Sequence, residues 1–229
     1  MKLLLFVSMT LLASIGAVHA SAQTAQQYPP LSNYMMAPEA EIALAKSAAP
    51  DNVSAHASIK ILTDAGYKVA AQGDNGFVCI VMRGWGGPIF TPVQMRAVVY
   101  DAKLRAPICF NPVASRTILP LEELRTKLGM AGKDPDQIAE AVQAAYTKGE
   151  LPKIETVAFA YMFSADQCLG PAGAWHPHMM VYAPYNDNAM MGGNPPGSML
   201  PAVGDDAGTP FAVTVIPVDH ELAVKMKRN

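Results

Sequence analysis

The sequence predicts a single α+β domain in which an antiparallel β-sheet packs against two or three helices. Strand-like and helix-like segments come in blocks, which is typical of α+β proteins rather than of parallel α/β sheets. Turn residues separate the first strand-like segments by a few positions, which favours hairpins. One long segment, residues 135–148, combines an apolar stripe at helical spacing with helix-ending residues on both sides.

Strands are expected where short apolar or alternating segments lie between turn residues. The first three, residues 58–62, 67–70 and 77–82, are separated by turn segments at 64–66 and 73–76 and predict an antiparallel meander. Later segments with strand character are 107–110, 156–163, 178–182 and 211–218. The last two are separated by a loop rich in methionine, glycine and proline, residues 186–209. Loops of this length are uncommon unless they are functional or disordered.

Helices are expected at residues 38–48, 120–128 and 135–148. Pro38 suits the first turn of a helix, and the acidic residues that follow it favour the positive helix start. Asp134 is a good N-cap for the third helix, and Gly149 provides a left-handed stop. Residues 94–104 fit a helix and a strand equally well.

The first 22 residues have the features of a secretory signal peptide and stand apart from the fold. Lys2 is followed by an apolar stretch, residues 3–18, and small residues allow cleavage after Ala20 or Ala22. The stretch is near the short limit for a membrane span, and no basic stop follows it. Residues 23–37 are polar and contain prolines, which predicts a flexible N-terminal arm. Residues 38–229 then form the domain, in the periplasm or outside the cell.

Composition narrows the possible partners. No later segment has about 20 uninterrupted apolar residues, so no stable membrane insertion is expected. The formal net charge of −2 is too mild to indicate nucleic-acid binding, and basic residues cluster only in the short C-terminal tail. A small-molecule partner is compatible with these features. The sequence indicates neither a cofactor nor an oligomeric state.

The chain has three cysteines, Cys79, Cys109 and Cys168. Export permits a disulfide, and the spacings match neither a zinc motif nor a Cys-x-x-Cys redox motif. Cys79 and Cys109 each lie inside a strand-like segment, which makes them the preferred pair. The spacing by itself leaves the other pairings open.

Three motifs resemble an uncharacterised family of exported bacterial proteins. They are Cys-Phe-Asn-Pro at residues 109–112, Tyr-Met-Phe-Ser at 161–164 and Trp-His-Pro-His at 175–178. The resemblance covers most of the mature chain. It implies an exported protein without an assigned activity, and it assigns no functional residue.

The histidines of the His-Pro-His segment are the first candidate site. Residues i and i+2 of an extended chain share a face, so His176 and His178 could bind one zinc or copper ion, with His220, Asp219 or Asp166 as a third ligand. The match to the cupin His-x-His motif fails, because no glutamate follows a few residues later. Two alternatives stay open: His178 acts as an acid–base group oriented by Asp166, or the histidines cap a loop.

Methionines offer a second possible metal set. Met190, Met191 and Met199 lie in the long loop, and soft thioethers select Cu(I). Methionine more often fills irregular cores, which is the alternative interpretation.

Arginine and tryptophan side chains form the last candidate cluster. Arg83 ends an apolar strand beside Trp85 and three glycines, and Arg116 lies before a helix; guanidinium groups at such places bind carboxylate or phosphate. The alternative is that Arg83 pairs with Glu122 or Glu123 and Trp85 packs on the core.

These observations favour a small-molecule-binding or scaffold protein of the cell envelope. Its pocket would be rimmed by Trp85, Arg83, His176 and His178, with Arg116 as a further ligand-binding residue. A hydrolase that uses His178 and Asp166, or a zinc or copper binder, are the alternatives.

Overall fold

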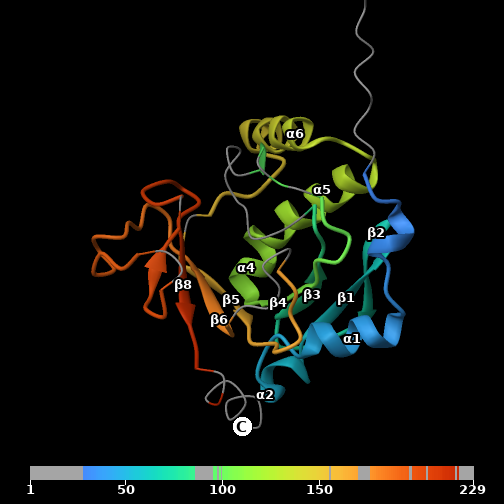
Figure 1. Ribbon diagram of the computed structural model, residues 1–229, viewed down its shortest axis with the longest axis horizontal. Coiled ribbons are helices and arrows are strands. Elements are labelled where there is room, and N and C mark those ends of the chain that lie inside the picture. Colours follow the sequence, from blue (N-terminus) through green and yellow to red (C-terminus); the bar gives the residue numbers. More distant parts are fainter. Residues whose placement is uncertain are drawn as a thin grey trace, which may run out of the picture.

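The computed structural model describes residues 28–85, 95–96, 98, 100–154, 156–169, 176–195, 198–204, 206–219 and 221. Within them the chain forms one eight-stranded sheet and five α-helices, which confirms the predicted α+β class (Figure 1). None of the helices in these residues is long and apolar enough to cross a membrane. The predicted signal peptide, residues 1–22, lies outside the described part of the chain.

The sheet has the strand order β2-β1-β3-β4-β5-β6-β8-β7. The bounds of its strands are β1 Ser58–Thr63, β2 Gly66–Ala71, β3 Val78–Met82, β4 Ala106–Phe110, β5 Ala158–Met162, β6 His178–Tyr182, β7 Ala202–Val203 and β8 Val213–Pro217. Its neighbouring strands pair antiparallel, except that β1 and β3 are parallel. The sheet is therefore mixed, whereas the sequence predicts an antiparallel one.

The parallel pair has a local cause in the turn that follows β2. The backbone N–H groups of Asp74 and Asn75 both donate to the carbonyl of His56, and Ser58 donates to Phe77. These bonds return the chain to the beginning of β1 instead of folding it back along β2. As a result β3 pairs with β1 rather than with β2, and the prediction of a three-strand antiparallel meander is wrong.

The helices are α1 Pro38–Lys46, α2 Asp51–Ser54, α4 Pro112–Thr117, α5 Leu119–Met130 and α6 Pro135–Lys148. At α6 the side chain of Asp134 accepts from the backbone of Gln137 at 2.8 Å, and Gly149 has a φ of 73°, as its caps predict. The sequence prediction missed α2 and α4. Helix α4 begins at an N-cap, Asn111, whose side-chain oxygen accepts from Ala114 N at 2.8 Å.

Helices cover the two faces of the sheet. On one face α4, α5 and α6 share the larger apolar core, and on the other α1 packs over a smaller cluster (Figure 1). Ile80 and Met82 of β3 belong to the larger core, and Cys79 and Val81 belong to the smaller one, as expected for alternate residues of a strand.

The predicted disulfide is confirmed. Cys79 and Cys109 lie opposite each other on β3 and β4, and their sulfur atoms are 2.02 Å apart. Both residues are fully buried beneath α1. The bond thus joins two neighbouring strands inside the domain and leaves Cys168 outside the disulfide.

The predicted N-terminal arm and the long loop are both held by specific contacts where they are described. Residues 31–34 of the predicted arm form a 3₁₀ helix, and Tyr34 is buried against Trp85 with ring centroids 3.8 Å apart. The long loop contains β7, and Asn194 Nδ2 donates to the carbonyls of both Met191 and Pro201.

Candidate functional site

His178 begins β6 in a buried position. It is 3% exposed, and its Nδ1–H donates to the carbonyl of His176 at 2.8 Å. Burial lowers the pKa of His178 from 6.5 to about 4, although the bond to His176 acts in the opposite direction. The imidazole is therefore neutral at neutral pH, and one of its nitrogens is engaged in holding the approach to β6.

The other described members of the predicted histidine sites are exposed, unlike the buried ring of His178. His176 is exposed, and its carbonyl accepts from both His178 and Gln167. Asp166 lies on an exposed turn, where its backbone N–H donates to Ser164 Oγ at 3.2 Å. The acid–base pair of His178 and Asp166 stays a prediction.

The metal hypotheses gain no support either. In the described residues there is no group of three or more His, Cys, Asp or Glu side chains that could hold a metal ion. His220, one of the three candidates for the third ligand, lies outside the described residues. The side chains of Met190 and Met199 are 72% and 51% exposed on the long loop.

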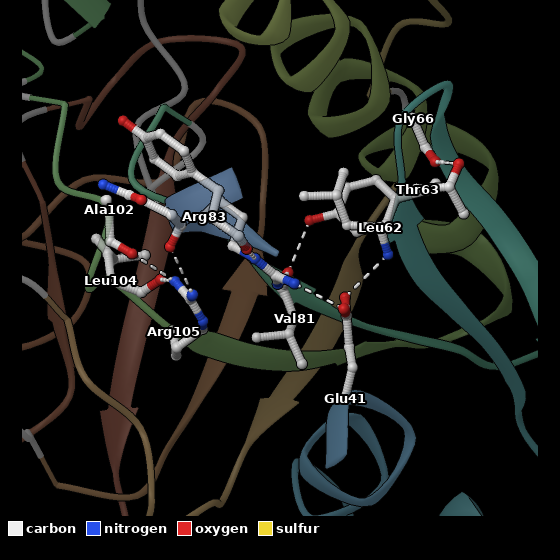
Figure 2. A network of polar contacts seen from close by, with 12 residues as sticks. Glu41, Leu62, Thr63, Gly66, Val81, Arg83, Ala102, Leu104 and Arg105 are labelled. Atoms are coloured by element: carbon white, nitrogen blue, oxygen red, sulfur yellow. Dashed lines mark hydrogen bonds and ion pairs between the residues drawn. The ribbon is translucent and has the colours of Figure 1, made fainter. Parts of the chain in front are cut away.

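Arg83 is fully buried and engaged in protein contacts (Figure 2). Its Nη2 lies 2.7 Å from Glu41 Oε2, its Nε donates to Tyr34 O at 2.7 Å, and its Nη1 donates to Val81 O. The second carboxylate oxygen of Glu41 accepts from Leu62 N at 3.0 Å. The guanidinium thus ties α1 and the 3₁₀ segment to the sheet. Of the two sequence interpretations, pairing with a carboxylate fits, but the partner is Glu41 rather than Glu122 or Glu123.

Trp85 and Arg116 do not complete a pocket with Arg83. Trp85 is 3% exposed and packs so closely on α5 that a Cβ at Gly129 would lie 2.5 Å from its ring. Arg116 is exposed on α4. Since two of these side chains are buried and the third faces solvent, they do not line one surface. The predicted rim of Trp85, Arg83, His176 and His178 is therefore not seen.

A groove of about 980 Å³ lies elsewhere, and sequence reasoning missed it. Four segments form it: the end of α6, the chain that leads into β5, the turn after β6 and the residues before β8. Their side chains that line it are Gln143, Tyr146, Thr147, Lys153, Ile154, Thr156, Val157, Ala183, Pro184, Tyr185, Pro210 and Phe211. We call this surface the aromatic groove.

Tyr185 occupies an unusual backbone position in the groove. Asn186 N donates to Ala183 O at 3.0 Å, so residues 183–186 form a turn with Pro184 and Tyr185 at its centre. Tyr185 has a φ of 64°, a region that glycine normally occupies at this place in a turn. Its side chain is nevertheless large, and 65% of it is exposed. A residue held in this region at a cost of about 1 kcal/mol or more is a reason to look for a function.

The turn is fixed to the segment before β8. Tyr185 N donates to Thr209 O, and Gly208 N donates to Asn186 O, both at 2.8 Å. The rings of Tyr146 and Phe211, which also line the groove, meet edge to face with centroids 5.1 Å apart. Two anchored aromatic surfaces therefore border the groove before any ligand arrives.

The groove carries little charge. Lys153 is the one side chain among the described lining residues that is charged at neutral pH. Burial, with a contribution from Glu122, raises the pKa of Tyr146 to about 12, so this phenol stays neutral. The hydroxyl of Tyr146 is buried and, within the described residues, has no hydrogen-bond partner.

A sequence signal for the groove exists in hindsight. A proline–aromatic pair follows β6 (Pro184-Tyr185), and another precedes β8 (Pro210-Phe211). Because β6 and β8 pair antiparallel, with Tyr182 opposite Val213, the end of one strand meets the beginning of the other. The two pairs become neighbours once this pairing is known.

Comparison with protein-family models, with curated proteins and with solved structures finds no match for this chain. The resemblance to an uncharacterised exported family therefore stays a prediction.

Proposed function

We propose that this is an exported binding protein for a small, largely apolar molecule, and that the aromatic groove is its binding site. The observation that carries the proposal is Tyr185, a large exposed ring held at a φ of 64° beside a groove of about 980 Å³. This volume lies at the upper end of the range typical of small-molecule sites. Export is part of the proposal, and the Cys79–Cys109 disulfide suits the oxidising compartments outside the cytoplasm.

The chemistry of the groove favours binding over catalysis. Its lining is dominated by aromatic, aliphatic and proline side chains, which contribute affinity by burying apolar surface. The phenol of Tyr146 stays protonated at neutral pH, and none of the described lining residues is a histidine, cysteine or carboxylate. These residues do not supply a general base. The groove therefore suits a ligand that is held without being transformed.

Titration with N-phenyl-1-naphthylamine, a neutral aromatic probe whose fluorescence rises in apolar surroundings, tests the proposal. Saturable binding is expected for the wild-type protein, and a loss of about tenfold or more in affinity is expected for Tyr185→Gly. Glycine suits a φ of 64° better than tyrosine does, so this variant should keep or gain thermal stability while it loses the ring. Reduced binding by Tyr185→Gly would then not reflect unfolding.

Leu200→Ala is the matched control, because Leu200 is 55% exposed and lies outside the groove lining. It should bind the probe like the wild type. Probe uptake that fails to saturate, or that is equal in the wild type and in Tyr185→Gly, would overturn the proposal.

A further inference from the structure

We infer that the aromatic groove selects ligands that carry an anionic group on an apolar body, and that Lys153 contacts the anion. This inference rests on the proposed function and adds the ligand class to it. Charged, polar and apolar side chains are distributed unevenly over the four segments of the groove.

The segments that line the groove differ in chemistry. The turn after β6 and the residues before β8 contribute Ala183, Pro184, Tyr185, Pro210 and Phe211, which are apolar apart from the Tyr185 hydroxyl. The end of α6 and the chain that enters β5 contribute Ile154 and Val157 together with the other described polar lining residues: Gln143, Tyr146, Thr147, Lys153 and Thr156. A ligand that contacts both groups of segments has an apolar part and a polar part.

The one charge among the described lining residues is positive. Lys153 is exposed, and no carboxylate is present among these residues. An ammonium beside apolar walls attracts an anion more strongly than it would in open solvent, because the walls exclude part of the screening water. The hydroxyl of Thr156 and the amide of Gln143 are further hydrogen-bond donors from the same two segments, whereas the hydroxyl of Thr147 already donates to Gln143 O at 2.9 Å.

The end of α6 is the competing electrostatic feature. A helix C-terminus carries a partial negative charge, which favours a cation. Here the terminal carbonyls are engaged: Gly149 N donates to Tyr146 O at 3.1 Å, and Glu150 N donates to Ala145 O at 2.9 Å. The full charge of Lys153 therefore outweighs the partial charge of the helix end.

Calorimetric titration with three ligands of one ring system tests the inference: 2-naphthoate, neutral 2-naphthylmethanol and cationic 2-naphthylmethylamine. We expect the anion to bind about two- to fivefold more tightly than the alcohol, a factor typical of one exposed ion pair, and the amine to bind most weakly. This difference should shrink in 1 M salt. Lys153→Gln should bring the affinity for the anion down to that for the alcohol.

Lys148→Gln is the matched control, since Lys148 is exposed in the last turn of α6 and does not line the groove. It should leave the order of affinities unchanged. If none of the three ligands binds, the proposed function itself fails. Three other outcomes would show that the groove binds ligands but would overturn the role given to Lys153. These are equal affinity for all three ligands, tightest binding of the amine, or an equal loss of affinity for naphthoate in both lysine variants.

Discussion

Arg83 and Glu41 illustrate how a charged residue at the end of a strand can be structural rather than functional. The pair is fully buried, and each partner has further hydrogen bonds to backbone groups (Figure 2). A buried charge that loses its partner is left without compensation, and such a loss typically costs about 3–5 kcal/mol. Removing one partner alone is therefore expected to lower stability far more than replacing both.

We predict that Arg83→Met lowers the free energy of unfolding by about 3–5 kcal/mol. The double variant Arg83→Met with Glu41→Leu should lose much less than the sum of the two single variants, because no unpaired charge stays buried. Urea unfolding of the four proteins measures the coupling. Arg116→Met, at an exposed arginine of α4, is the control and should change stability by less than about 0.5 kcal/mol. Additive losses would contradict a coupled pair.

At this scale the sequence indicated the chemistry of Arg83 but not its partner. Pairing with a carboxylate was foreseeable, because a guanidinium at the end of an apolar strand needs compensation. Which glutamate pairs with Arg83 was not foreseeable, because Glu41 reaches Arg83 only after α1 has packed on the sheet. Tyr185 shows the same limit, because the turn that contains its positive φ is held by bonds from Tyr185 N to Thr209 O and from Gly208 N to Asn186 O, across more than twenty residues of the chain.

Helix α6, with local signals at both ends, was predicted well; α4 was missed although Asn111 caps it, and pairings that depend on distant contacts were not predicted. Helix α6 begins and ends where Asp134 and Gly149 indicate, because capping involves residues within one turn. The parallel pairing of β1 with β3 and the two-residue strand β7 depend on where distant segments pack. Hydrophobic patterns do not encode this information.

The disulfide between β3 and β4 gives the prediction at the scale of elements. It closes a loop with a sequence separation of 30 residues, and a bond of this kind typically contributes about 2–4 kcal/mol. Replacing both Cys79 and Cys109 by alanine should lower the free energy of unfolding by about this amount. Denaturant unfolding under oxidising conditions provides the measurement.

Cys168→Ala is the matched control, because this cysteine lies outside the bond. It should keep both the wild-type stability and its sensitivity to reductant. An unfolding midpoint of the wild type that is the same with and without reductant would contradict a stabilising role for the Cys79–Cys109 bond.

The groove is a property of the whole molecule, which explains why the sequence did not reveal it. Its walls come from α6, the entrance to β5 and one end of the β6–β8 pair, so every one of these elements must be in place before the lining residues meet. The candidates that the sequence indicates, such as His178 and Arg83, have chemically active side chains. In the folded protein both side chains are buried and form part of the framework.

Two buried groups give the molecule opposing responses to pH. Burial raises the pKa of Glu122 to about 7, although Arg125, 3.0 Å away, acts to lower it, and burial lowers the pKa of His178 to about 4. Glu122 binds its proton more tightly in the folded state, so its contribution to stability is complete below pH 4.5 and is lost as the pH rises through 7. His178 binds its proton less tightly in the folded state, so its contribution is complete above pH 6.5 and is lost as the pH falls towards 4.

Between pH 4.5 and 6.5 the two responses should largely cancel, because folding takes up a proton at Glu122 and releases one at His178. Relative to the wild type, Glu122→Gln should gain stability as the pH rises through this window, with a slope that approaches about 1.4 kcal/mol per pH unit. His178→Asn, whose amide can still donate to His176 O, should lose stability over the same window with a similar slope. Urea unfolding at several pH values between 4 and 8 measures the stability of each variant relative to the wild type. The pH-dependent contribution of the surface carboxylates is the same in all three proteins and cancels in this difference. Parallel pH profiles for all three proteins would contradict the assignment of these responses to the two buried groups.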